Sequence, residues 1–245
     1  MNFRFIHVYS DDVSIDAKAV AGEITKIFPS CKVDVRPAFK YDERRIELAR
    51  IADIKQPFEK QPRQKTSDTA MMPPIYDGFA LQRIFAETIS AAEADHMHLI
   101  FTSLLACTFS EDDWRYHART VICGSPSLIS TAGIVEGPAK PREFYLAQLG
   151  GVAVDTNLKK RFAGRFIDYG DDKMMTAAAA IYTLQALFFF VTDGELFCKE
   201  KSCMLYNAHW QEELIYLIEK GALCAHHRQM ASKFNKNNRS VKESF

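Results

Sequence analysis

Residues 174–203 read MMTAAAAIYTLQALFFFVTDGELFCKEKSC, an almost wholly apolar run that leads into two cysteines. The apolar part, residues 174–192, is just long enough to cross a bilayer. It contains Tyr182 and Gln185, however, and aspartates flank it on both sides. A helix that is apolar on nearly every side is typical of the centre of a globular fold. We therefore predict a buried central helix here in preference to a membrane span.

The sequence before this helix alternates between strand and helix patterns. Strands are expected at residues 3–9, 32–36, 98–103, 119–123 and 128–135, and amphipathic helices at 13–28, 41–54 and 78–91. Helices then follow to residue 234. The expected fold class is α+β, or α/β, with a mixed twisted sheet packed by helices.

The expected domain organisation is one domain over residues 1–234. Its sheet-rich part covers 1–135 and its helical part covers 136–234. The polar residues 235–245 are expected to form a flexible tail.

Bulk composition excludes some classes of partner. The chain has 245 residues, no net charge at pH 7 and six cysteines. This charge balance gives no sign of a nucleic-acid partner. The N-terminal stretch MNFRFIHVYSDD lacks the basic start and apolar run of a signal peptide. We therefore expect a cytoplasmic protein with no membrane partner, whose cysteines stay reduced and act as metal ligands or core residues.

The strongest chemical pattern is a set of paired cysteines and histidines after the central helix. Cys198 and Cys203 have the spacing C-x4-C, and Cys224 and His227 follow with the spacing C-x2-H. Two short pairs are the usual way to give zinc four thiolate or imidazole ligands. Buried thiols and a disulfide are the alternatives. We predict one structural zinc ion held by these four residues, with His226 or His209 as substitutes for the fourth ligand.

This part of the chain resembles the archaemetzincins, a family of zinc metallopeptidases from archaea and some other organisms. Their signature is H-E-x-x-H-x-x-G-x-x-H, followed at once by a cysteine, a second cysteine, a methionine and a later cysteine pair. The chain as a whole is also similar to an archaeal group of metallopeptidase-like proteins. The stretches YHARTVICGSPSLISTAGIVEGPAKPREFY and LYNAHWQEEL carry that similarity. The resemblance implies a metzincin-like fold with a structural zinc site.

The same resemblance indicates that the catalytic residues of the family are missing from this chain. With Cys198 on the first family cysteine, Gly194 matches the family glycine. The three histidines and the general-base glutamate fall on four apolar residues: Leu187, Val191 and Phe197 for the histidines, and Phe188 for the glutamate. None of these side chains binds zinc or transfers a proton.

The later positions also depart from the family pattern. Leu205 occupies the methionine position, with Met204 one residue earlier, and Cys224 is one residue further along than expected. His227 stands at the last cysteine. We therefore expect a metallopeptidase-like protein that keeps the structural site, lacks the usual catalytic site and binds a peptide or a partner.

A rebuilt metal site is the alternative, and it would make the chain an active metal-dependent hydrolase. No histidine is followed by glutamate, so H-E-x-x-H is absent. His96 and His98 alternate along one strand and face the same side, where Asp95 or His117 could join them. Asp168, Asp171 and Asp172 form an acidic cluster, although caps at the start of the following helix are the favoured interpretation.

Two further segments offer candidate residues. The hydroxyl-rich loop at residues 125–131 lacks a G-x-S-x-G motif. Lys140, Arg142, Glu143 and Tyr145 follow a predicted edge strand, and edge strands can hold extended peptides. These four residues are the candidate contacts to a peptide or protein partner, with ordinary surface charge as the alternative. The sequence does not predict an oligomeric state.

Overall fold

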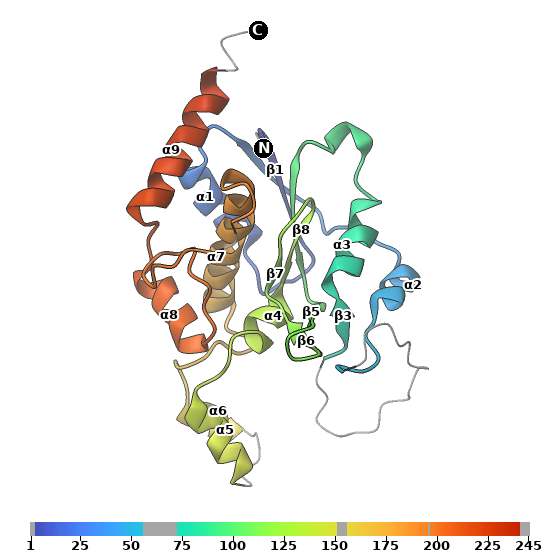
Figure 1. Cartoon of the computed structure of the whole chain (residues 1–245), viewed down its shortest axis with the longest axis vertical. Coiled ribbons are helices and arrows are strands. Elements are labelled where there is room, and N and C mark those ends of the chain that lie inside the picture. The colour runs from blue at the N-terminus through green and yellow to red at the C-terminus, as the bar shows by residue number, and fades with distance from the viewer. Residues whose placement is uncertain (1–2, 56–72, 151–155, 196, 241–245) are drawn as a thin grey trace.

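A computed structural model describes residues 3–55, 73–150, 156–195 and 197–240 of the chain. Two β-sheets and the helices around them make up these residues (Figure 1). The predicted α+β fold with a mixed sheet is confirmed.

The larger sheet has five strands in the order β2-β1-β4-β8-β7. Parallel pairing joins the first four strands, and β7 runs antiparallel to β8 at one edge. Its strands are β1 (Phe5–Ser10), β2 (Lys32–Arg36), β4 (Met97–Thr102), β7 (Val121–Ile122) and β8 (Ser127–Ser130). The register places His7 of β1 opposite both Asp34 of β2 and His98 of β4.

A smaller sheet has three strands that the sequence patterns did not reveal. Its order is β3-β5-β6, and its members are β3 (Ile75–Asp77), β5 (Leu105–Ser110) and β6 (Arg115–Ala118). Cys107 lies buried in β5.

The strand predicted at 128–135 is in fact a strand followed by a helix. β8 ends at Ser130, and the short helix α4 (Thr131–Glu136) begins at the next residue. The Ser130 side chain accepts a hydrogen bond from the Gly133 backbone N–H, which is the contact of a helix N-cap. The apolar run continues through both elements because both are buried.

Helices cover both faces of the larger sheet (Figure 1). One face packs against α1 (Ala17–Ile27) and α7 (Asp172–Val191), which also contact each other. The opposite face packs against α3 (Gly78–Ala86), beside α2 (Glu43–Ile46). The remaining helices are α5 (Arg142–Leu149), α6 (Thr156–Arg161), α8 (Gln211–Lys220), α9 (Ala225–Ser240) and the 3₁₀ turns η1 (Glu47–Ala49) and η2 (Ala91–Glu93).

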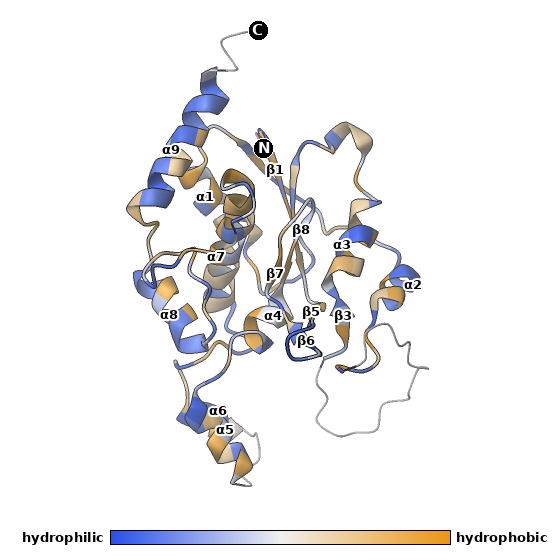
Figure 2. Ribbon diagram, viewed as in Figure 1, coloured by the Kyte–Doolittle hydropathy of each residue, from blue (hydrophilic) through white to orange (hydrophobic). Residues whose placement is uncertain are grey.

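The α7 helix is the predicted central helix, and it is buried. It is long and apolar enough to cross a membrane, yet 67% of its most apolar 18-residue window lies inside the fold. In Figure 2 the ribbon of α7 is mainly in the hydrophobic colours, whereas that of α9 is mainly in the hydrophilic ones. An aromatic cluster joins α7 to its neighbours, because Phe188 packs against Phe28, which packs against Phe3 and Phe234.

The helix α9 corrects the boundary predicted for the C-terminal tail. It continues past residue 234 to Ser240. Asn238 is 2% exposed and its side-chain amide donates to the Phe3 carbonyl at 2.9 Å. Asn235 similarly donates to the Ile27 carbonyl at 2.9 Å. Residues 241–245 lie outside the described part of the chain.

Candidate metal centre

The four predicted zinc ligands converge beside the ends of α7 and α9. Cys198 and Cys203 lie on the loop after α7, Cys224 precedes α9, and His227 lies in the first turn of α9. One donor atom from each lies within 4.8 Å of all the others. Cys203, Cys224 and His227 are buried, and Cys198 is partly exposed.

The distances between these donors suit a tetrahedral ion. The Cys198 and Cys224 sulfurs are 4.0 Å apart, and His227 Nδ1 lies 3.0 Å from the Cys224 sulfur and 3.7 Å from the Cys203 sulfur. Zinc–sulfur bonds of about 2.3 Å at tetrahedral angles place two sulfurs about 3.7 Å apart. Little movement is therefore needed for all four donors to bind one ion.

Backbone contacts hold the cysteine loop in this shape. Cys198 pairs with Tyr206 and Cys203 pairs with Ala222 as isolated bridges, so the loop is tied to the segment before α9. The Glu200 backbone N–H donates to the Cys198 sulfur at 3.4 Å. This contact helps to fix the position of the Cys198 sulfur in the loop.

Burial sets the protonation of two of the donors. It raises the pKa of the Cys203 thiol to about 12, and the nearby Cys198 thiol adds to the rise. At neutral pH a cation must therefore displace this proton to bind. Burial also lowers the pKa of His227, so its imidazole is neutral and ready to bind a metal.

The central helix contacts this cluster through Phe188. Phe188 is 2% exposed, and its ring lies 5.5 Å from the His227 ring at an interplanar angle of 85°. Leu187 is fully buried, Val191 is partly buried and Phe197 is exposed. Leu187 and Phe188 supply core packing, and none of the four positions offers a metal donor.

The two substitutes for the fourth ligand stand apart from the cluster. His226 is exposed, and its ring lies 5.1 Å from the ring of His227. His209 is exposed on the loop before α8, where its Nε2 lies 3.5 Å from the Asn207 amide. Neither belongs to the group of donors within 4.8 Å of one another.

The residues of the alternative rebuilt site lie in three separate places. His96 and His98 do share one face, but His117 lies on β6 of the smaller sheet, 2.8 Å from Asp113. Asp171 caps α7 by accepting from the Met174 N–H, and Asp168 pairs with Lys159 at 2.7 Å. The capping interpretation is confirmed for Asp171, and the structure does not bring His117, on β6, to His96 and His98.

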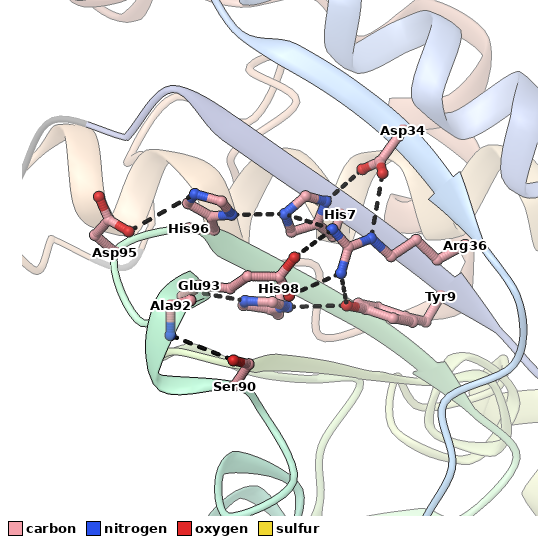
Figure 3. A network of polar contacts seen from close by, with 10 residues as sticks. All are labelled: His7, Tyr9, Asp34, Arg36, Ser90, Ala92, Glu93, Asp95, His96 and His98. Carbon is pink, nitrogen blue, oxygen red and sulfur yellow. Dashed lines mark hydrogen bonds and ion pairs between the residues drawn. The ribbon is translucent and has the colours of Figure 1, made fainter.

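The structure instead adds a residue that the sequence patterns did not single out. His7 of β1 lies between His96 and His98, with ring centroids 5.0 Å and 5.1 Å away (Figure 3). His7, Glu93 and His96 form a second group of donors within 4.8 Å of one another. Only the parallel pairing of β1 with β4 brings these segments together, and no local motif reveals it.

The candidate partner-binding residues lie at the start of α5. The Lys140 ammonium donates to the Val135 carbonyl at 3.3 Å, and the backbone N–H of Lys140 donates to the Tyr145 hydroxyl. Glu143 pairs with Arg165 at 3.1 Å, and Tyr145 is exposed. Ala139, just before them, already forms a bridge to Trp210. Lys140, Arg142, Glu143 and Tyr145 therefore lie on a helix and its entry, beside a strand-like pair that is already formed.

The fold and the cluster of four potential metal ligands indicate a metalloprotein. Comparison of the sequence with known families then gives its family. Residues 2–234 match a family described as "Probable metallopeptidase family (DUF6775)", and the chain belongs to it. No curated protein and no solved structure matches the chain.

Proposed function

We propose that this member of the metallopeptidase family binds one structural zinc ion at Cys198, Cys203, Cys224 and His227. Four thiolate or imidazole donors leave no open position for a substrate or an activated water. The zinc therefore stabilises the helical part of the domain, residues 136–234, by tying the loop after α7 to the start of α9.

The proposal extends to the activity of the chain. Peptide hydrolysis by H-E-x-x-H chemistry is absent, and the chain acts by binding a peptide or a protein partner. The observation that carries this is the burial of Phe188 against His227, because apolar packing occupies the place that the resemblance gives to the general base. The residues Lys140, Arg142, Glu143 and Tyr145 remain the candidate contacts.

The setting proposed for the protein is the cytoplasm of an archaeon. Its six cysteines are all free thiols, as expected in a reducing compartment. The archaeal source rests on the resemblance to the archaeal group alone. No nucleic acid and no membrane is proposed as a partner.

Metal analysis combined with a peptidase assay tests the proposal. The purified chain should hold one zinc, and Cys203→Ser should lose the metal and the fold of residues 198–227 together. Cys107→Ser is the matched control, because Cys107 is also buried but lies in β5, away from the cluster. Hydrolysis of a mixed peptide library that a chelator abolishes would overturn the assignment of a non-peptidase.

An active metal-dependent hydrolase is the second candidate function. The observation that favours it is the group formed by His7, Glu93 and His96. If this candidate is correct, His96→Ala should abolish hydrolysis while the zinc at the cysteine cluster stays in place.

A further inference from the structure

The group formed by His7, Glu93 and His96 lies on the face of the larger sheet opposite the cysteine cluster. Side chains alternate along β1, so Ile6 and Val8 face the core around α7, whereas His7 and Tyr9 face the α3 side. His7 Nε2 lies 2.8 Å from His96 Nδ1. A carboxylate oxygen of Glu93 lies within 4.8 Å of both histidine donors.

Each of the two imidazoles has a carboxylate near its outer ring nitrogen, the one that points away from the other imidazole (Figure 3). The Asp34 carboxylate bonds His7 Nδ1, on the far side of the ring from His96. The Asp95 carboxylate lies 3.7 Å from His96 Nε2, again on the far side. The hydrogen-bonded Asp34 carboxylate favours a proton on the outer nitrogen of His7 and leaves its inner nitrogen to bind a metal, whereas the Asp95 contact is too long for a hydrogen bond. Both inner nitrogens face one another here.

Glu93 is fixed in place by its own backbone. Its carbonyl accepts from the His96 N–H at 3.0 Å and from the His98 ring at 3.0 Å. The other nitrogen of the His98 ring is 3.1 Å from the Tyr9 hydroxyl. His98 is therefore a positioning residue, which contacts the Glu93 backbone and not the metal donors. Glu93 ends η2, and the hydrogen bond from the His96 N–H to the Glu93 carbonyl turns the chain so that the two side chains come within reach of one another.

A cation already occupies these acceptors. The Arg36 guanidinium donates to both oxygens of Glu93, at 2.7 Å and 2.8 Å, and lies 3.1 Å from His7 Nε2. It also donates to Asp34 at 3.2 Å and to the Tyr9 hydroxyl at 3.0 Å. Hydrogen bonds from Arg36 lower the pKa of Glu93 to about 2, so the carboxylate is charged at neutral pH.

The group is open to solvent and has excess negative charge. Three carboxylates, on Asp34, Glu93 and Asp95, face one guanidinium. The side chain of Glu93 is 28% exposed and that of His96 is 17% exposed, so an ion can reach the donors from solution.

We propose that His7, Glu93 and His96 form a second metal site, which binds a divalent transition-metal cation such as Zn²⁺ in exchange for the Arg36 guanidinium. Asp34 positions the His7 imidazole through the hydrogen bond at its outer nitrogen. Three protein donors leave one position for water, so the site is of the open kind. It is weaker than the cysteine cluster, because Arg36 must leave Glu93 before the metal binds. This inference deepens the second candidate function, because it describes the metal site that such a hydrolase would use, and it does not rest on the structural zinc site.

Titration of the metal-free full-length chain with Co²⁺ tests the proposal. The first equivalent should fill the cysteine cluster and produce thiolate-to-cobalt charge-transfer absorption. A second, weaker equivalent should bind without further charge transfer, because its site has no sulfur. A chain that takes up one equivalent only, also after Arg36→Met, would overturn the proposal.

Variants assign the second event to its residues. His96→Ala should remove it and leave the charge-transfer band intact, which also shows that the variant is folded. His117→Ala is the matched control and should keep both events, because His117 lies on β6. Asp34→Asn should weaken the second event by about 10–100-fold, as substitutions behind a ligand do.

The substitution Arg36→Met tests whether the metal ion replaces the Arg36 guanidinium. Removal of the competing guanidinium should tighten the second event, and an unchanged affinity would contradict the exchange. Failure of the first event in the wild type would instead contradict the structural site alone, so the two proposals fail separately.

Discussion

Substitution of Phe188 by alanine tests the role of α7 as the packed centre of the fold. The Phe188 ring is 2% exposed and contacts both Phe28 and His227, with centroids 5.5 Å away in each case. Its loss removes a full aromatic side chain from the core and leaves a cavity. Changes of this kind cost about 3–5 kcal/mol of unfolding free energy.

Urea denaturation with saturating zinc measures this cost. With a slope of about 3 kcal/mol per molar urea, the unfolding midpoint should fall by about 1–1.7 M. The loss is a large part of the stability of about 5–15 kcal/mol that is typical of a domain. If Phe188→Ala does not fold, Phe188→Leu provides the milder test, with an expected cost of about 1.5 kcal/mol or less.

Phe189→Ala is the matched control on the same helix. Phe189 is only partly buried, and its ring contacts Phe190 at 5.3 Å. Alanine is the better helix former, which offsets part of the lost contact. The control should cost about 1 kcal/mol, near the average for substitutions. Equal midpoints for the two variants would refute the conclusion that this face of α7 is the buried one.

Two other predictions concern polar groups that support the same fold. Gln211→Ala should lower the free energy of unfolding by at least about 2 kcal/mol, because the buried side-chain amide accepts from the Ile167 N–H and donates to the Ile134 and Val135 carbonyls. Urea denaturation midpoints would show this loss. The matched control is Gln229→Ala, at an exposed position, which should stay near wild type. Arg36→Met should destabilise the chain most above pH 4.5, the ordinary pKa of glutamate, because Arg36 lowers the pKa of Glu93 to about 2. This stabilisation is lost as the pH falls from 4.5 towards 2, so the two unfolding curves should converge in that window. A difference that grows on acidification would contradict the pairing.

The sequence was sufficient to predict the central helix and the four cluster residues. An apolar run of this length has few places in a globular fold other than the centre, and the spacing of Cys198, Cys203, Cys224 and His227 is local. Residues that are close in the sequence stay close in the folded chain, so the donors converge as the pattern indicates. Asp171 was predictable as a cap for the same reason.

The smaller sheet and the histidine group were not predictable in this way. The strand β5 has no clear alternation, because three of its residues are buried in a row. The helix α4 continues an apolar run, so only the hydroxyl of Ser130 indicates where the strand ends. His7 meets His96 through pairing between strands 89 residues apart, which no short motif encodes.

The most direct test of the account is anomalous diffraction at the zinc edge from crystals grown without added metal. The account predicts one peak per chain, bounded by the sulfurs of Cys198, Cys203 and Cys224 and by His227 Nδ1. The expected distances are about 2.3 Å to each sulfur and about 2.0 Å to the nitrogen. The absence of a peak among the four donors would contradict it.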